Sequence, residues 1–199
     1  MELTDAVSRR RMVRAFSPDP VGQAVVDDLC DLARRAPSAG NSQALDLLVL
    51  EGPEQVGRYW DVTLPEPRRA TFRWPGLVAA PVLVVVAVRP DAYRERYAEP
   101  DKAATGLGAD LAAWSVPYWW VDAGAAVEHL LLGVVDRGLG ACLFGLFAHE
   151  EAVARAFGVP DDRRLVGTIA IGHPAPDAPG RSAGRSRSDL DTLIHRGNW

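Results

Sequence analysis

Apolar residues along this chain form two kinds of pattern, continuous runs and stripes with the spacing of a helix. The longest run, at 80–88, reads APVLVVVAV and is mostly β-branched. Such a run predicts a strand that is buried on both faces. Residues 22–36 instead carry their apolar residues on one helical stripe, and Pro37 predicts the end of that helix.

The same reasoning predicts the remaining elements. Further strands are expected at 45–50, 141–144 and 165–171, and helices from residue 4 or 5 to about 12, at 53–59 and at 150–157. Residues 61–76 contain three prolines and a late glycine, which predict an irregular loop. Helices alternate with single strands, so the predicted class is α+β or α/β, with a sheet of four or five strands sandwiched by helices.

Residues 123–135 are apolar almost all round, which is typical of a buried helix. One thin sheet could hardly cover such a helix on all sides, so this pattern also predicts a dimer. His129 lies on this apolar helix, and we interpret it as a core histidine rather than a proton donor.

Composition narrows the class of protein. The 199 residues are enough for one domain with its own core, and 48% hydrophobic with 24% charged residues is ordinary for a globular protein. A net charge of −4 argues against a general nucleic-acid binder, and the longest apolar stretch is too short to span a membrane. The acidic start MELTD lacks the apolar core of a signal peptide, so we predict a cytoplasmic protein.

Side chains that carry chemistry by themselves are scattered. Cys30 and Cys142 are isolated in apolar surroundings and are interpreted as small buried hydrophobes, and the four histidines are too far apart to predict a metal site. The chain has no catalytic triad, carboxylate pair, phosphate-binding loop or dinucleotide fingerprint. If this is an enzyme, its chemistry must therefore come from a cofactor.

Two basic segments lie near the ends of the chain. Residues 9–16 read RRRMVRAF, and if they continue the first helix, Arg10 and Arg14 share a face and can bind one anion such as a phosphate, while Arg11 points elsewhere. In the sequence GRSRS at 184–188, Arg185 and Arg187 alternate and can reach one anion from an extended segment. Arg181 is a further candidate. The alternative for both segments is solvated surface charge.

Four motifs, in this order and spacing, resemble the nitroreductase family of flavoenzymes. They are RRRMVRAF, the turn APSAGNSQ at 36–43, GLGACLFGLF at 138–147 and the late arginine pair. The resemblance reaches from residue 9 to 199. It implies a nitroreductase-like α+β fold whose central, mainly antiparallel sheet is sandwiched by helices, in an interlocked homodimer with flavin sites at the subunit interface. One domain would span 1–199, with a substrate-covering excursion at 91–121 and a C-terminal arm at 175–199.

The resemblance also implies which residues contact the cofactor FMN. Arg10 would hold the phosphate, Arg14 would reach the pyrimidine edge of the ring and Arg11 would add a less constant contact. The other implied contacts are Arg185 and Arg187 on the phosphate, Pro37, Ser38, Ala39 and Asn41 from the partner subunit's turn, and the backbone N–H groups of Gly145 and Leu146 at the reactive nitrogen. An ordinary helix stop and a buried strand ended by a glycine turn are the alternatives for the last two segments.

This chain departs from the family pattern at two places. Met12 stands where members commonly have serine, and Ala44 and Leu45 follow Gln43 where members commonly have Pro-Trp. The first departure removes a hydroxyl group that could contact the cofactor, and the second removes a residue that would form part of its wall.

The function implied is ping-pong transfer of hydride from NADH or NADPH (NAD(P)H) through FMN to a nitro-aromatic compound, a quinone or an activated alkene. No acid–base side chain is expected to be catalytic. Tyr118, Trp119 and Trp120 would form a flat slot for a small planar electron acceptor, or would pack a dimer interface.

Alternatives are a family member with different chemistry (reductive dehalogenation, flavin fragmentation or a deazaflavin donor) and a non-catalytic flavin-binding protein. A ligand-free interaction module is disfavoured, because the two arginine pairs would repel each other. No nucleic-acid or membrane partner is expected.

Overall fold

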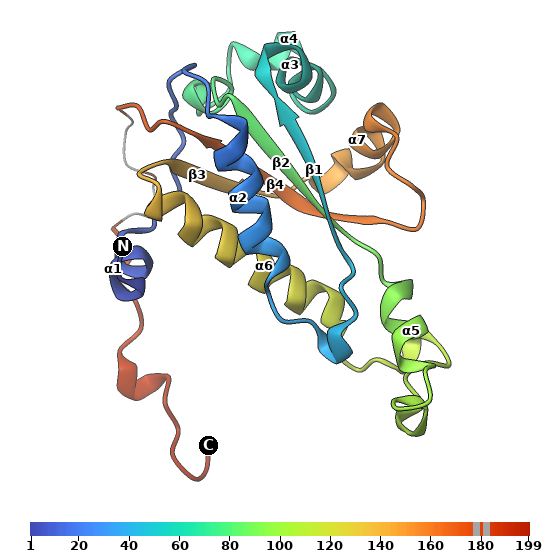
Figure 1. Ribbon diagram of the computed structural model, residues 1–199. Helices are drawn as coiled ribbons and strands as arrows, with labels where there is room; N and C mark the ends of the chain where they lie inside the picture. The colour runs from blue at the N-terminus through green and yellow to red at the C-terminus, as the bar shows by residue number, and fades with distance from the viewer. Residues whose placement is uncertain (177–179, 181–183) are drawn as a thin grey trace.

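The computed structural model of the protein describes residues 1–176, 180 and 184–199. One four-stranded sheet carries helices on both faces (Figure 1). The strands lie in the order β1-β2-β4-β3 and every neighbouring pair is antiparallel, which confirms the predicted α+β class and antiparallel sheet. The elements are β1 (Leu45–Glu51), β2 (Val82–Val88), β3 (Gly140–Phe144), β4 (Arg164–Gly172), α1 (Leu3–Arg9), α2 (Gln23–Arg34), α3 (Gly52–Thr63), α4 (Glu66–Arg69), α5 (Asp91–Tyr97), α6 (Tyr118–Asp136) and α7 (Glu150–Phe157).

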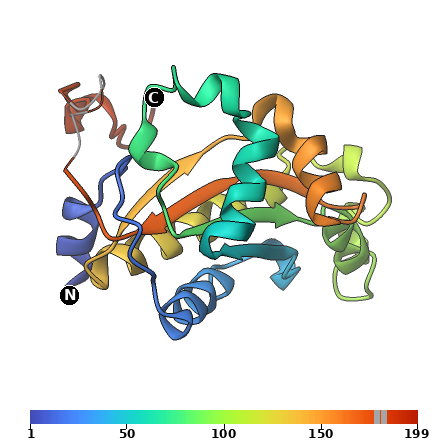
Figure 2. The ribbon, with the colours of Figure 1, turned by 90° about the horizontal axis from the view of Figure 1, so that it is seen from above.

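Strand β2 is buried along its whole length, as its apolar run predicts. Successive side chains of a strand point to opposite faces, so β2 contributes to two cores. Val82, Val84 and Val86 pack with α2 and α6, whereas Leu83 and Val85 pack with α3 and α7. Figure 2 shows these two helical layers above and below the sheet.

Helix α6 is covered within a single chain. The sheet lies beneath it, α1 packs on it, and α2 runs along it at Gly133, where an added Cβ would lie 2.6 Å from Leu32 Cδ1. The apolar pattern of residues 123–135 therefore does not require a second subunit. The helix also begins at Tyr118, directly after Pro117 and five residues before its expected start, so the predicted aromatic slot residues occupy its first turn.

Two other expectations about local structure are wrong. Part of the loop expected at 61–76 is helical, because α3 continues to Thr63 and α4 follows, with Arg69 pairing to Asp61 and Glu66. The first helix ends at Arg9 rather than near Met12. The chain then continues in an extended form along β3, where the Val13 N–H donates to the Ala141 carbonyl at 2.8 Å.

One polar pair lies inside the core between β4 and α3. The Tyr59 hydroxyl and Thr168 Oγ1 are 2.8 Å apart, and Thr168 is fully buried. Burial raises the pKa of Tyr59 to about 12. Each hydroxyl satisfies the other, so the pair is tolerated among apolar neighbours.

Candidate functional site

The basic start of the chain does not present Arg10 and Arg14 on one face of a helix. Helix α1 ends at Arg9, and the backbone of the next residues pairs with β3 through an isolated parallel bridge between Met12 and Ala141. The Leu143 N–H also faces Met12 Sδ at 3.4 Å. Pairing with a distant strand has taken up the backbone groups that would have continued the helix, so the predicted i,i+4 arrangement is wrong.

The three arginines of this segment point to different partners. Arg10 lies 3.6 Å from Glu128 on α6, and Arg11 folds back to donate to the carbonyls of Ser8 and Arg10. Arg14 is half-buried, donates to the Met12 carbonyl at 3.1 Å and lies 5.6 Å from the centre of the Trp74 ring. Arg14 thus keeps its charge without a carboxylate partner among the described residues, which suits it to an anion or an electron-rich ring edge.

The end of β3 contains the second predicted contact. Leu146 is buried, and the backbone N–H groups of Gly145 and Leu146 have no acceptor within the part of the chain that the structure describes. A Cβ on Gly145 would lie 3.1 Å from the Phe147 ring, so glycine leaves room at this point. We call residues 10–16 together with residues 143–146 the edge region. Considering only the described residues, it offers one cation without a carboxylate partner and two backbone donors without an acceptor.

The turn at residues 37–43 is tightly folded and held from outside. Gly40 has φ of +62°, and Asn41 and Gln43 also have positive φ, which non-glycine residues seldom adopt. An added Cβ on Gly40 would lie 2.6 Å from the Tyr97 ring, and Arg96 donates to the Gly40 carbonyl at 2.8 Å. The first helix of the 91–121 excursion therefore packs directly on the turn.

Asp122 is the residue that sequence reasoning missed. Its Oδ2 accepts a hydrogen bond from the Ala39 N–H at 2.8 Å and another from the Tyr93 hydroxyl at 2.7 Å. Burial, and then the bond to Asp122, raises the pKa of Tyr93. One carboxylate thus ties the turn to both α5 and α6. The available signal was a lone acidic residue in the apolar first half of α6, although nothing local indicated its partners.

A polar cavity of about 300 Å³ lies beside this turn. We call the turn, α5 and Asp122 together the turn region. Among the residues predicted to contact the flavin, Pro37, Ser38 and Asn41 line the cavity, and Asp122 and Tyr93 line it too. The Ser38 hydroxyl accepts a hydrogen bond from the Gln43 N–H at 3.1 Å, so this side chain is already used to shape the turn.

The turn and the basic start of the chain lie far apart in one molecule (Figure 1). Met12 pairs with Ala141. In the register of the sheet, Ala141 lies in one row across the strands with Glu51, the last residue of β1. The turn precedes Leu45, the first residue of β1. At about 3.4 Å per residue, the six steps along β1 correspond to roughly 20 Å. A single chain therefore does not bring the two groups of predicted contacts together.

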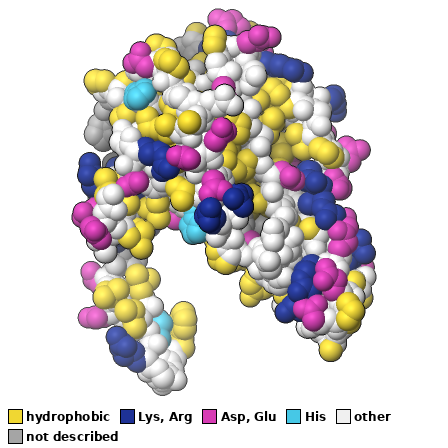
Figure 3. All heavy atoms as spheres, in the orientation of Figure 1, with side chains coloured by type: hydrophobic (Ala, Val, Ile, Leu, Met, Phe, Trp, Pro, Cys, Tyr) yellow, Lys and Arg dark blue, Asp and Glu magenta, His cyan; other side chains and the backbone are white. Residues whose placement is uncertain are grey.

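The C-terminal arm projects from the body of the molecule. Arg185 and Arg187 are exposed, and neither has a hydrogen-bond or ion-pair partner among the residues that the structure describes. Arg181 lies outside the described residues. Figure 3 shows apolar side chains along the arm, and Leu190, Leu193, Ile194 and Trp199 are all exposed.

The three aromatic residues of the predicted slot differ in exposure. Trp119 is 8% exposed and packs among the rings of Tyr93 and Trp114. Tyr118 and Trp120 are partly exposed, and Arg164 lies 5.8 Å from the centre of the Trp120 ring. Tyr118 and Trp120 therefore present open ring surface, whereas Trp119 mainly stabilises the cluster beneath them.

His129 and the two cysteines take structural positions. His129 Nδ1 lies 3.2 Å from the Leu32 carbonyl, so this histidine ties α6 to α2. Cys142 is buried in the core, and burial raises the pKa of the Cys30 thiol. Within residues 1–176, 180 and 184–199, no group of three or more metal-ligating side chains is placed to hold a metal ion, and no helix is long and apolar enough to cross a membrane.

The chain is similar to known proteins over most of its length. The model of the Nitroreductase family matches residues 7–173. A 4-nitrobenzoate reductase of Nocardioides sp. is 29% identical, covering 98% of this chain and 90% of that protein. A protein of Methanothermobacter thermautotrophicus, provisionally named NADH dehydrogenase/NAD(P)H nitroreductase, is 25% identical over 100% of this chain and 88% of its own. The crystal structure of a provisionally named nitroreductase from Desulfovibrio desulfuricans, in complex with FMN, superposes with a TM-score of 0.69 at 22% identity, covering 100% of this chain and 98% of that one.

Proposed function

Because this chain belongs to the nitroreductase family, it is an oxidoreductase of the nitroreductase type, and we propose that FMN is its cofactor. When bound, FMN would supply the hydride chemistry between NAD(P)H and a nitro-aromatic compound, a quinone or an activated alkene. The relatives support this proposal, since one is named a 4-nitrobenzoate reductase and another provisionally an NAD(P)H nitroreductase. A cytoplasmic location stays a prediction.

One observation carries the proposal: the edge region offers unpaired groups of the kind that a flavin needs. Arg14 is half-buried without a carboxylate partner among the described residues, and the N–H groups of Gly145 and Leu146 have no acceptor there. Leu146 is buried, and donors in buried residues are normally paired, so its open N–H next to the exposed Gly145 indicates a place for a ligand. The residues present therefore fit the cofactor.

Each predicted contact is assigned a role in this proposal. Arg14 would hold positive charge next to the ring, where it favours the reduced, anionic form, and the two backbone donors would face the reactive nitrogen. Arg185 and Arg187 would bind the phosphate, because they are otherwise without partners among the described residues. Arg10 and Arg11 would have to exchange their present partners for the phosphate. We therefore expect them to contribute less to the binding free energy of FMN.

We also propose that the protein acts as a homodimer. In one chain the turn lies roughly 20 Å from the level of Met12, as the strand register shows. The turn of a second subunit would bring Pro37, Ser38, Ala39 and Asn41 to the edge region. The apolar residues Leu190, Leu193 and Ile194 of the arm support the same assembly, since all three are exposed.

Substrate recognition would depend on shape rather than on an acid–base side chain. Tyr118 and Trp120 present flat ring surface for a small planar acceptor. His129 is bonded to α2 and is not proposed as a proton donor. These surfaces would position the acceptor against the flavin, and this positioning would supply most of the acceleration of hydride transfer.

The test is FMN binding by a variant with one cation removed from each end of the chain. Arg14→Ala combined with Arg187→Ala should lose at least about 3 kcal/mol of binding free energy, taking roughly 1.5–3 kcal/mol for each charge-assisted contact. This corresponds to an affinity reduced by about 150-fold, measured by fluorescence titration. Arg196→Ala, on the same exposed arm, is the matched control and should bind FMN normally.

Two results would overturn the proposal in different ways. Unchanged FMN affinity in the double variant would show that the cofactor does not bind at the edge region. Tight FMN binding by the natural protein without bleaching by NADH or NADPH would instead favour a non-catalytic flavin-binding protein or a member with a different hydride donor.

A further inference from the structure

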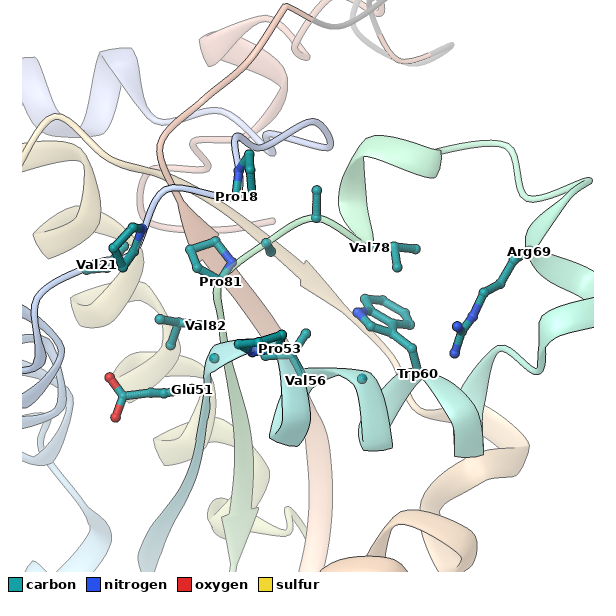
Figure 4. A pocket seen from close by; sticks show the side chains of 15 residues that line it. Pro18, Val21, Glu51, Pro53, Val56, Trp60, Arg69, Val78, Pro81 and Val82 are labelled. Carbon is teal, nitrogen blue, oxygen red and sulfur yellow. The ribbon is translucent and has the colours of Figure 1, made fainter.

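A second cavity lies where β1 ends and β2 begins, and none of the residues that line it is assigned to the flavin. It is bounded by the segment Pro18–Val21, the first turns of α3 and residues 78–82 leading into β2, and its volume is about 510 Å³ (Figure 4). This volume is within the range of about 300–1,000 Å³ that is usual for small-molecule sites.

The walls of this cavity are mainly apolar. Prolines and valines from three separate segments line it, together with the indole of Trp60. Arg69 also lines it, but its Nη atoms pair with Asp61 at 2.7 Å and Glu66 at 3.1 Å, and its Nε donates to the Leu64 carbonyl at 3.0 Å. The guanidinium is thus already neutralised, and Glu51 adds a further negative charge to the lining. An anionic ligand is therefore disfavoured.

Trp60 adds a directional hydrogen-bond donor to the lining of the cavity. Its indole is 4% exposed, and its Nε1 has no hydrogen-bond partner among the described residues. Figure 4 shows the nitrogen side of the ring turned toward the space between Pro53, Pro81 and Val78. A buried donor without a partner is unfavourable, so an acceptor that reached it would be favoured.

The position of this donor is fixed by packing. The Trp60 ring stacks on Phe144 with 5.7 Å between ring centres, and meets Tyr59 edge-to-face at 5.2 Å. The nitrogen is covered by the surrounding protein, so neighbouring side chains must shift for the acceptor of a ligand to reach it. A rigid aromatic wall with one donor selects a ligand by the place of its acceptor.

We propose that this cavity binds a neutral, apolar small molecule with one hydrogen-bond acceptor, of the aromatic ketone class. The ligand's rings would lie among the prolines and valines, and its carbonyl would accept from Trp60 Nε1. The site shares no residue with the proposed flavin contacts and does not rest on the proposed function.

The test compares two probes of similar shape, benzophenone and diphenylmethane, on the purified full-length protein. Both should bind by calorimetry, with benzophenone the tighter. Trp60→Phe should weaken benzophenone by about 2- to 12-fold, the range expected for one hydrogen bond of 0.5–1.5 kcal/mol, and leave diphenylmethane unchanged. Photo-activated benzophenone should label peptides from residues 51–60 or 78–82.

A second variant keeps the test decisive if Trp60→Phe is poorly folded. Gly57 lines the cavity from α3, and an added Cβ there meets nothing within 4 Å, so Gly57→Leu should fold while filling the space. It should abolish binding of both probes, whereas Glu54→Leu, on the same helix outside the lining, should not. Absence of binding, binding that survives Gly57→Leu, or displacement of benzophenone by FMN would each overturn the proposal.

Discussion

The turn region and the edge region contain similar polar groups, yet they differ in whether those groups have partners. In the turn region, Asp122 accepts two hydrogen bonds, and Arg96 bonds both to the turn and to Asp101. In the edge region, Arg14 bonds only to a carbonyl and a ring, and the N–H groups of Gly145 and Leu146 have no described acceptor.

This difference separates residues that shape the molecule from residues that await a ligand. Changing a fully bonded group should alter the free energy of unfolding, because its partners are left unpaired. Changing an open group should alter binding and leave unfolding almost unchanged. The distinction can be tested without knowing the substrate.

The largest effect on unfolding is expected at Asp122. Asp122→Ala leaves the Ala39 N–H and the Tyr93 hydroxyl without their acceptor, and should lower the free energy of unfolding by about 2–4 kcal/mol. Asp122→Asn should cost less, because an amide oxygen can still accept. Denaturant unfolding of the flavin-free protein measures both.

The control for this prediction is Glu128→Ala, an exposed acidic residue on the same helix whose ion pair with Arg10 should contribute at most about 1 kcal/mol. If Asp122→Ala and Glu128→Ala were equally stable, the turn region would not be held as the structure indicates, and the contrast between the two regions would fail.

A smaller effect is expected for the buried pair of Tyr59 and Thr168. Tyr59→Phe should cost about 1 kcal/mol at neutral pH, since it removes one hydrogen bond. The folded protein raises the pKa of Tyr59 from 10.0 to about 12, so it binds this proton more tightly than the unfolded chain. This proton therefore contributes about 2–3 kcal/mol to the free energy of unfolding. The contribution is fully present below pH 10 and is lost as the pH rises from 10 to 12.

The measurement is denaturant unfolding at several pH values between 9 and about 12, an interval set by the typical tyrosine pKa. The loss should be smaller in Tyr59→Phe, although some should persist, because the pKa of Tyr93 is raised too. An identical loss in both proteins would show that Tyr59 does not titrate in this range.

The smallest effect on unfolding is expected in the arm. Leu193 is 61% exposed, so Leu193→Ala should change the unfolding of the isolated chain by less than about 0.5 kcal/mol. If the arm packs on a second subunit, the same change should weaken the dimer, seen as more monomer by sedimentation at micromolar concentration. A natural protein that is a folded, FMN-loaded monomer at that concentration would contradict the proposed homodimer.

The sequence was most informative where burial alone decides the structure. The apolar run at 80–88 predicted β2 almost to the residue, and the stripe at 22–36 predicted α2. In both elements, the pattern of apolar residues within the element is enough to predict it. The start of α6 was missed although Pro117 marked it, because the aromatic residues that follow are as common in strands and loops as in helices.

The candidate site was less predictable, because its geometry depends on contacts between distant segments. Spacing alone could not show that Arg10 and Arg14 leave the helix, since the strand that competes for their backbone lies about 130 residues later. Asp122 was visible as a charge in an apolar helix, but its bond to Ala39 joins residues 83 positions apart. The unpaired nitrogen of Trp60 likewise follows only from the packed structure.

The extended start of the chain also affects how the sheet meets other molecules. β3 is the last strand in the sheet order, and an uncovered edge strand is a template for pairing with a strand of another protein. Residues 12 and 13 lie along this edge and occupy its backbone groups at Ala141 and Leu143. At the opposite edge, β1 carries Asp46, paired with Arg163, and charge there disfavours such pairing. Residues 12 and 13 on one side and charge on the other thereby disfavour edge-to-edge aggregation of the sheet.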